Sequence, residues 1–542
     1  MPNGRGARAE AGATEGHEPS SPYSGPMTTP RRTSTTHPLQ IAEVSAGRGA
    51  IGITLCPGKK GESLFGAPWD RDLEKDLEAV QAWGATTLVT LLEDHEFDEL
   101  TVAQLRTRPE ALGLDWIHLP IRDVSTPATE FEAAWSWAGL LLRERLRAGA
   151  RVVVHCRGGL GRAGLVAARL LVEMGESPES AIDRVRAARK GAIETSAQER
   201  HVMACRRHDS ARDAAASRVF GSMFGGAVGD AFGYAVEFDS LASIARKFGP
   251  RGIETPTLKG GKLVVSDDTQ MTLFTGEGML LARDWSGDAV IASVREAYLD
   301  WYATQQRTSA GARKPYGTLC KEKVLCVPRA PGNTCMSALR AGGNGTPDRP
   351  INGSKGCGGV MRTAPFGLIP TRINPDQAFD LGVRAAALTH GHPSGFLPAG
   401  AIARMICRMC EGMTLAQAVE ESRIHLAPLP GSEETAAVLS VALEKPLHSE
   451  LGRFPGGWQG WVGEEALAIA VQVGLGASSF QELMRRSANH DGDSDSTASI
   501  AGQLHGAEHG IAGIPAGWIA RLDCLEPVRR IADGMFRAGH EG

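Results

Sequence analysis

The chain has 542 residues, of which 42% are hydrophobic and 22% are charged, and its formal net charge is −4. This length exceeds one ordinary hydrophobic core, so we expect two to four domains. The charge provides no basic surface for nucleic acid, and no apolar run approaches the roughly 20 residues that span a bilayer. Ten scattered cysteines and the lack of an apolar signal segment predict a cytoplasmic protein with reduced thiols and neither a nucleic-acid nor a membrane partner.

The first segment, residues 1–37, is rich in Ser, Thr, Pro, Gly and Arg and has almost no large apolar side chain. Such a composition buries too little surface to offset the entropy of ordering the chain. We therefore predict that residues 1–37 are disordered.

Residues 38–208 alternate amphipathic segments with short apolar runs rich in β-branched residues. Alternation of this kind is typical of an α/β domain with a central parallel sheet. The pattern predicts helices at 70–83, 130–148, 165–174 and 179–188, and strands at 86–92, 116–120 and 151–155.

A cysteine lies six positions before an arginine, with glycines between them, in residues 155–162 (HCRGGLGR), between a predicted strand and a predicted helix. In such a loop, backbone N–H groups and the start of the helix can surround one tetrahedral anion. The same dipoles favour a thiolate at Cys156, and Arg162 can hold two phosphate oxygens. The alternative is a glycine-rich turn around a buried cysteine.

The loop 155–162, together with the strings at 120–123 and 191–195, resembles the dual-specificity phosphatases, most closely the kinase-associated phosphatases. The resemblance implies that Cys156 is the nucleophile within the His155–Arg162 motif and that Asp123 is the general acid. Asp123 could instead be a turn residue. The resemblance also gives Gln198 a place near the hydrolytic water.

The family usually carries Ser or Thr after the arginine, and this chain has Ala163. That hydroxyl helps the thiolate to leave phosphocysteine, so we expect slow turnover, and a domain that only binds phosphate is the alternative. Arginine-rich stretches at 184–189 and 206–212 predict solvated helix faces, with a basic rim around the phosphate pocket as the other interpretation.

Beyond the polar joint at 206–212 the strand-like runs nearly vanish, and residues 213–542 predict one large all-α domain. Two acidic strings, SDD at 266–268 and DSDS at 493–496, stand at the openings of predicted helices. One helix cap needs one oxygen donor, whereas each string offers at least three. Clustered carboxylates repel one another unless a divalent cation lies between them, and Mg²⁺ prefers oxygen ligands. Acidic helix caps without metal are the alternative.

Four further strings at 221–238, 329–334, 354–362 and 389–393 accompany the acidic ones in a fixed order. Together they resemble the ADP-ribosylglycohydrolase family, which implies an all-helical fold with two Mg²⁺ ions at the ribose. Carried onto this chain, the implied metal ligands are Ser266, Asp267, Asp268, Asp493, Asp495 and Ser496.

The resemblance also implies the residues that surround the nucleotide. Glu237 or Asp268 would act as acid or base. His390 would lie at the adenosine end, although it could instead be a core histidine. The pyrophosphate would lie against the backbone of a glycine loop that includes Ser354, Gly356, Gly358 and Gly359.

We therefore predict a bifunctional hydrolase with an N-terminal cysteine-phosphatase fold and a C-terminal ADP-ribosylglycohydrolase fold. It would remove ADP-ribose from a protein or small molecule with Mg²⁺, and phosphate from a phosphorylated substrate with Cys156. The alternatives are an ADP-ribosyl hydrolase whose front domain only binds phosphate, and a structural protein without turnover; clustered carboxylates disfavour the latter.

Overall fold

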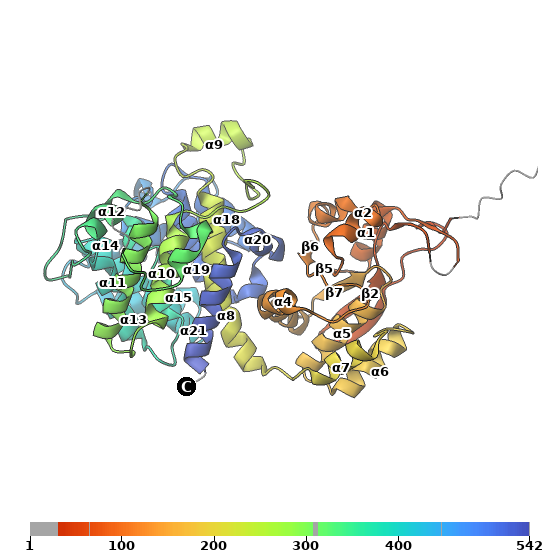
Figure 1. Cartoon of the computed structure of the whole chain (residues 1–542). Coiled ribbons are helices and arrows are strands. Elements are labelled where there is room, and N and C mark those ends of the chain that lie inside the picture. The colour runs from red at the N-terminus through yellow and green to blue at the C-terminus, as the bar shows by residue number, and fades with distance from the viewer. Residues whose placement is uncertain (1–30, 64–65, 307–312, 446, 541–542) are drawn as a thin grey trace, which may run out of the picture.

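The computed structural model describes residues 31–63, 66–306, 313–445 and 447–540 of the chain. Figure 1 shows an α/β front domain beside a larger helical domain. Most of the segment predicted to be disordered lies outside the described residues. Its last residues do not follow that prediction, because Arg32 forms a β-bridge with Trp69 and its guanidinium lies 4.0 Å from the Trp69 ring. No helix in the described part of the chain is long and apolar enough to cross a membrane.

The front domain is built on a five-stranded sheet with strand order β1-β2-β7-β5-β6. All neighbours run parallel except β1, which is antiparallel to β2. The three strands predicted from sequence are confirmed, whereas the β1–β2 hairpin was missed. The strands are β1 (Ala42–Ala46), β2 (Gly49–Leu55), β5 (Thr87–Thr90), β6 (Asp115–His118) and β7 (Arg151–Cys156), and β3 (Lys60–Gly61) pairs with β4 (Trp69–Asp70) outside this sheet.

Helices cover both faces of this sheet, as the continuous apolar runs of its strands require. Val153 of β7 packs with one apolar cluster and its neighbours Val152 and Val154 with the other. The helices of the front domain are α1 (Leu73–Ala82), α2 (Asp94–Glu99), α3 (Arg108–Ala111), α4 (Thr129–Ala148), α5 (Gly161–Glu173), α6 (Pro178–Ala188) and α7 (Ser196–Ala204).

The described residues of the second domain form helices joined by loops, with isolated β-bridges and no β-strand, which confirms the predicted all-α class. Its helices are α8 (Ser210–Gly233), α9 (Leu241–Phe248), α10 (Asp267–Leu280), α11 (Gly287–Thr304), α12 (Asn333–Arg340), α13 (Pro375–Ala387), α14 (Pro393–Cys410), α15 (Leu415–Leu426), α16 (Glu433–Glu444), α17 (Gly463–Gly476), α18 (Phe480–Ala488), α19 (Ser494–His509), α20 (Ala516–Arg521) and α21 (Leu525–His540).

Two central helices, α8 and α19, touch backbone to backbone. Glycines at every fourth position of α8 face α19, and a Cβ on Gly225, Gly229 or Gly233 would lie 2.1–2.2 Å from a carbonyl oxygen of α19. Gly502 of α19 faces α8 in the same way: a Cβ on Gly502 would lie 2.0 Å from the Gly225 carbonyl oxygen. This contact fixes the start of α19 against the end of α8, so side chains from the two helices meet there.

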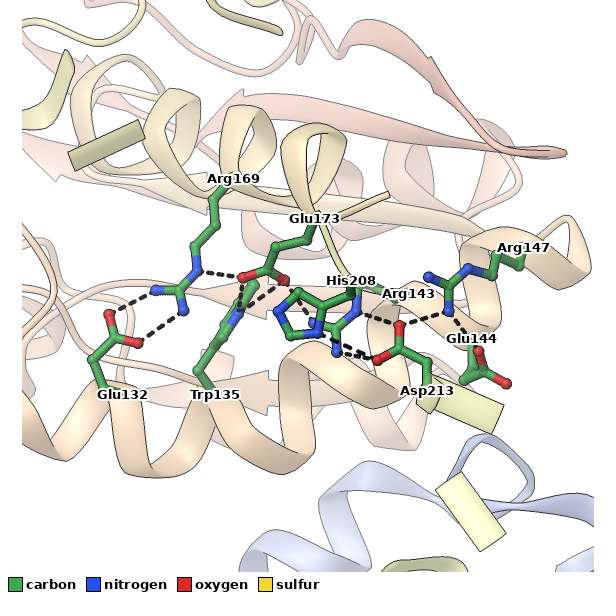
Figure 2. A network of polar contacts seen from close by, with 9 residues as sticks. All are labelled: Glu132, Trp135, Arg143, Glu144, Arg147, Arg169, Glu173, His208 and Asp213. Atoms are coloured by element: carbon green, nitrogen blue, oxygen red, sulfur yellow. Dashed lines mark hydrogen bonds and ion pairs between the residues drawn. The ribbon is translucent and has the colours of Figure 1, made fainter. Parts of the chain in front are cut away.

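A buried ionic network joins the front domain to α8 (Figure 2). Arg143 of α4 binds both carboxylate oxygens of Asp213 of α8, at 2.8 and 2.9 Å, and Glu173 of α5 at 2.6 Å. Arg147 adds a second cation to Asp213 at 2.7 Å, and Arg169 binds Glu173 at 2.7 Å. The guanidinium neighbours hold the pKa values of Asp213 and Glu173 below their usual range, although burial opposes this.

A second contact holds α20 against the edge of the sheet. The Asp115 carboxylate accepts the N–H groups of Ala516 and Gly517 at 2.8 and 3.0 Å, and pairs with Arg145 at 2.7 Å. Glu110 binds Arg521 through both oxygens, at 2.6 and 2.7 Å. The two domains therefore meet through paired ionic groups and also through apolar packing, in which Trp137 of α4 lies against Phe224 of α8 with their ring centres 6.2 Å apart.

We predict that Asp213→Asn destabilises the whole chain, because it leaves the buried Arg143 with one charged partner fewer. Breaking a buried pair costs about 3–5 kcal/mol, so thermal denaturation should begin several degrees lower. Asp213 and Glu173 have lowered pKa values, so their contribution is present at neutral pH and is lost as pH falls below about 4. The variant should therefore show a shallower acid dependence than the unmodified chain.

The matched control is Asp94→Asn, because Asp94 also pairs with an arginine but has a side chain that is 80% exposed. Exposed pairs contribute about 0–1 kcal/mol, so this variant should melt like the unmodified chain. Equal effects of the two substitutions would contradict the prediction.

Candidate active sites

The front domain presents an anion loop between β7 and α5. Cys156 ends β7, and the N–H of Gly159 points at its sulfur, with nitrogen and sulfur 3.3 Å apart. Gly159 has φ +68°, and a Cβ there would lie 2.3 Å from the Thr54 carbonyl. Only glycine fits this turn, which brings the loop around the cysteine.

Arg162 lies beneath this loop and is 1% exposed. Glu96 of α2 binds its guanidinium through both oxygens, at 2.6 and 2.9 Å, and the Ile121 carbonyl accepts a third bond at 3.0 Å. The carboxylate of Asp123 reaches the same guanidinium at 2.8 Å, while half of its side chain is exposed. The fold thus brings together Cys156, Arg162 and Asp123, and adds Glu96, which the sequence analysis missed.

His155 lies on the opposite side of β7 from the cysteine. Its Nε2 is 2.8 Å from the Thr90 hydroxyl, which also accepts the indole N–H of Trp116. Burial lowers the pKa of His155 to about 3, so the ring is neutral and adds no positive charge to the loop. Gln198 caps α7 and donates to the Ser125 carbonyl at 3.1 Å.

The helical domain contains a cavity of about 460 Å³ where the two acidic strings meet. Asp267 and Asp268 reach it from the start of α10, and Asp493, Asp495 and Ser496 reach it from the start of α19. Further walls come from Glu237, Phe238, the 330–335 loop, Gly356, Cys357, Gly358, Met361, His390 and Trp461.

Asp230 of α8, a residue that the sequence analysis did not single out, fixes the first acidic string. Its buried carboxylate accepts the N–H of Ser266 at 2.8 Å and that of Thr269 at 2.9 Å. The Ser266 hydroxyl caps the same helix by accepting the N–H of Asp268 at 3.2 Å. Ser266 therefore lies behind Asp267 and Asp268 and does not line the cavity. The sequence signal for Asp230 was its place in the string at 221–238, where it is the one carboxylate in a run of glycine and apolar residues before Glu237.

The second string has its own partners. Asp493 caps α19 by accepting the N–H of Ser496, and Asp495 accepts the same N–H at 2.9 Å. The thiol of Cys357, from the glycine loop, donates to Asp493 with sulfur and oxygen 2.7 Å apart. Cys357 lines the cavity, and the sequence analysis did not identify it as a site residue.

Burial, followed by repulsion from neighbouring carboxylates, raises the pKa values of four carboxyls in the cavity wall. The pKa values of Asp267 and Glu237 rise to about 8, and those of Asp268 and Asp495 lie well above the usual range. Asp268 Oδ2 and Glu237 Oε2 are buried without a hydrogen-bond partner.

Among the described residues, no three His, Cys, Asp or Glu side chains are grouped so as to hold an ion by themselves. The donor set is nevertheless one that fits a hard divalent cation. It consists of oxygens, and the orphaned Asp268 oxygen lacks the positive partner that a buried carboxylate requires.

The glycine loop and His390 form the other end of the cavity. A Cβ on Gly358 would lie 3.0 Å from the His390 ring, whose pKa burial lowers to about 3. Gly359 packs instead against the Gly395 carbonyl, and the Ser354 hydroxyl accepts the N–H of Gly356 at 3.2 Å.

The N–H of Cys357 is also engaged, by the Trp461 carbonyl at 3.2 Å. Two of the N–H groups expected to face a pyrophosphate therefore already have partners within the protein. Of the four loop residues named from sequence, Gly356 and Gly358 line the cavity.

Two stretches of the chain match known families. Residues 211–541 match the family described as ADP-ribosylglycohydrolase, and residues 69–202 match the one described as Swiss Army Knife protein, DSP-PTPase phosphatase domain. ADP-ribosyl-dinitrogen reductase glycohydrolase of Rhodospirillum rubrum is 25% identical over 336 residues, which cover 59% of this chain and 95% of that protein. Human cyclin-dependent kinase inhibitor 3 is 31% identical over 162 residues, covering 29% of this chain and 71% of that protein. Both resemblances found in the sequence are thereby confirmed.

Solved structures give matches over the same two stretches. An ADP-ribosylglycohydrolase-related protein complex covers 60% of this chain and 99% of its own, with 23% identity and a TM-score of 0.43. A kinase-associated phosphatase with its catalytic cysteine replaced by serine covers 30% and 92%, with 29% identity and a TM-score of 0.27.

We predict that the metal-free chain loses stability as pH rises from about 4 to about 8, the interval between the unfolded and folded pKa values of Asp267 and Glu237. Their raised pKa values mean that the protonated carboxyls stabilise the fold at low pH, and this contribution is fully lost once pH passes about 8. Thermal denaturation in EDTA would measure the decline. Glu237→Gln should reduce it, whereas Glu433→Gln on the surface should not, and a flat profile for the unmodified chain would refute the prediction.

Proposed function

The chain belongs to the ADP-ribosylglycohydrolase family and carries a front domain of the dual-specificity phosphatase type, and from this premise we propose a two-site hydrolase. The helical domain removes ADP-ribose from a protein or small molecule with two bound Mg²⁺ ions. The front domain hydrolyses phosphate monoesters through Cys156. Both activities are hydrolytic, and each site lies in its own domain.

The observation that carries the first activity is the meeting of two acidic helix starts in one cavity, with an Asp268 oxygen left unpartnered. When bound, the divalent ions would supply Lewis-acid stabilisation of the ribose hydroxyls and of an attacking water. Asp267, Asp268, Asp493, Asp495 and Ser496 would hold them, and Ser266 would position Asp267 and Asp268 by capping α10.

Glu237 is the group best suited to move a proton in this cavity. It lines the wall, its Oε2 has no partner, and burial, followed by the neighbouring carboxylates, raises its pKa to about 8 in the metal-free cavity. A protonated carboxyl can donate to the oxygen or nitrogen of the departing acceptor. Neutral His390, beneath Gly356 and Gly358, would orient the adenosine end without adding charge.

In the front domain, the Asp123–Arg162 contact supports the phosphatase role. The exposed carboxylate of Asp123 lies 2.8 Å from a nitrogen of the arginine that would hold the phosphate, so it stands where a leaving oxygen would be protonated. Cys156 would attack phosphorus, with the loop N–H groups and Arg162 holding the phosphoryl oxygens.

A front domain that only binds phosphate is the second candidate function for this part of the chain. The observation that favours it is Ala163, which is fully buried at the start of α5 and offers no hydroxyl to a departing thiolate. In that case the domain would hold the phosphate group of its target without releasing inorganic phosphate at a useful rate.

We predict Mg²⁺-dependent release of ADP-ribose from an arginine- or serine-linked ADP-ribosylated protein. EDTA, or the double substitution Asp493→Ala and Asp495→Ala, should reduce the rate at least a hundredfold. EDTA removes the ions, and the double substitution removes two of the side chains that would hold them. Cys156→Ser is the matched control and should leave this rate unchanged. Release that survives both EDTA and the double substitution would reject the metal-dependent mechanism.

We predict that the chain releases phosphate from an aryl phosphate and that Cys156→Ser abolishes this activity. Ala163→Ser should raise the steady-state rate several-fold without changing the initial burst of the phenol released as Cys156 is phosphorylated, because the added hydroxyl speeds only the second step, in which water releases phosphate. A burst of one equivalent with no turnover in the unmodified chain would favour the binding role. Hydrolysis that persists in Cys156→Ser would exclude Cys156 as the nucleophile.

A further inference from the structure

The charge of Arg162 is already compensated within the front domain. Glu96 binds it through both oxygens, and Asp123 binds it at 2.8 Å. One guanidinium with two carboxylates has a formal charge of −1, or of zero while Asp123 carries the proton that it would give to a leaving oxygen. Arg162 can shape a phosphate site, but this triad gives it no net attraction for a phosphate dianion.

Two other cations lie behind the anion loop. The Lys59 ammonium donates to the Arg157 carbonyl at 3.1 Å. Arg189 donates through Nε to the Gly159 carbonyl at 3.1 Å and through its terminal nitrogen to the Gly158 carbonyl at 3.3 Å. Three successive carbonyls of the loop are thus held outward by two side chains from distant parts of the sequence.

A planar trans peptide directs its carbonyl and its N–H in opposite directions. Holding the carbonyls of residues 157–159 outward therefore turns the N–H groups of residues 158–160 inward. In the peptide between Gly158 and Gly159, both contacts are present: the Gly158 carbonyl accepts a hydrogen bond from Arg189, and the Gly159 N–H points at the Cys156 sulfur. The two cations set the orientation on which anion binding by the loop depends.

Neither cation pairs with a carboxylate in the described part of the chain. Lys59 is 9% exposed, and its ammonium lies 4.7 Å from the centre of the Trp69 ring. Burial lowers its pKa to about 8, and the nearby Cys56 and Cys156 sulfurs oppose that shift. Burial also lowers the pKa of Arg189, and the Cys156 sulfur opposes that shift. Their positive charge thus remains available to a thiolate or phosphate at Cys156.

We infer that Lys59 and Arg189 are positioning residues of the phosphate site. From behind the loop they hold its N–H groups toward the anion and supply the net positive charge that the Arg162 triad lacks. This inference rests on the proposed function of the front domain. It also gives the basic stretch at 184–189 a specific role, in place of a solvated face or a general rim.

The experiment uses the full chain and inorganic tungstate, a tetrahedral dianion. Alkylation of Cys156 by iodoacetamide at fixed pH is followed on its own peptide by mass spectrometry, and tungstate protection gives a site-specific Kd. Lys59→Met and Arg189→Met should each weaken tungstate binding and slow alkylation about tenfold, as removal of a nearby buried charge requires. Lys59→Arg and Arg189→Lys should recover most of the loss.

The matched controls are Lys60→Met and Lys190→Met, which remove an exposed cation next to each residue. They should change the tungstate Kd less than twofold. Equal affinity in the Met variants and the unmodified chain would overturn the inference alone. Failure of the charge-conserving variants to recover would show a purely structural role and overturn it too. Failure of tungstate to protect the unmodified chain would overturn both the inference and the phosphate site.

Discussion

The close contact between α8 and α19 is the constraint on which the larger domain depends. Glycines on both helices bring the backbones so near that a single added Cβ would meet a carbonyl oxygen at about 2 Å. The approach places Asp230 of α8 under the start of α10 and sets the acidic start of α19 opposite it. Burial strengthens the repulsion among these carboxylates, and a bound divalent cation would relieve that repulsion.

The two sites meet opposite electrostatic demands in one chain. The helical cavity concentrates carboxyl groups, among which Asp267 and Glu237 have pKa values raised to about 8, and suits cations. The anion loop must attract a dianion although its arginine is already paired with Glu96 and Asp123. Backbone dipoles and two cations behind the loop can meet that demand without competing with the phosphate for space.

At the junction between the domains, the buried acidic and basic side chains are paired with one another. Arg143 with Asp213 and Glu173, and Glu110 with Arg521, fix one domain against the other. The cavity of about 800 Å³ beside this junction contains Arg145 and Arg521, and both are saturated by protein partners. These two arginines are therefore already engaged within the protein. The paired groups of the junction hold the two domains together.

The sequence by itself determined the two fold classes, the anion loop and the acidic helix starts, because each depends on spacing within one short segment. Ser266 and Asp493 do stand at the starts of α10 and α19, as the capping pattern predicted. The sequence could not reveal Asp230, Glu96, Cys357 or Lys59 as members of the sites, since each reaches its partner from another element. Pairing across the fold depends on which elements pack together, so only the tertiary structure decided that Arg162 is neutralised and that Lys59 and Arg189 are not.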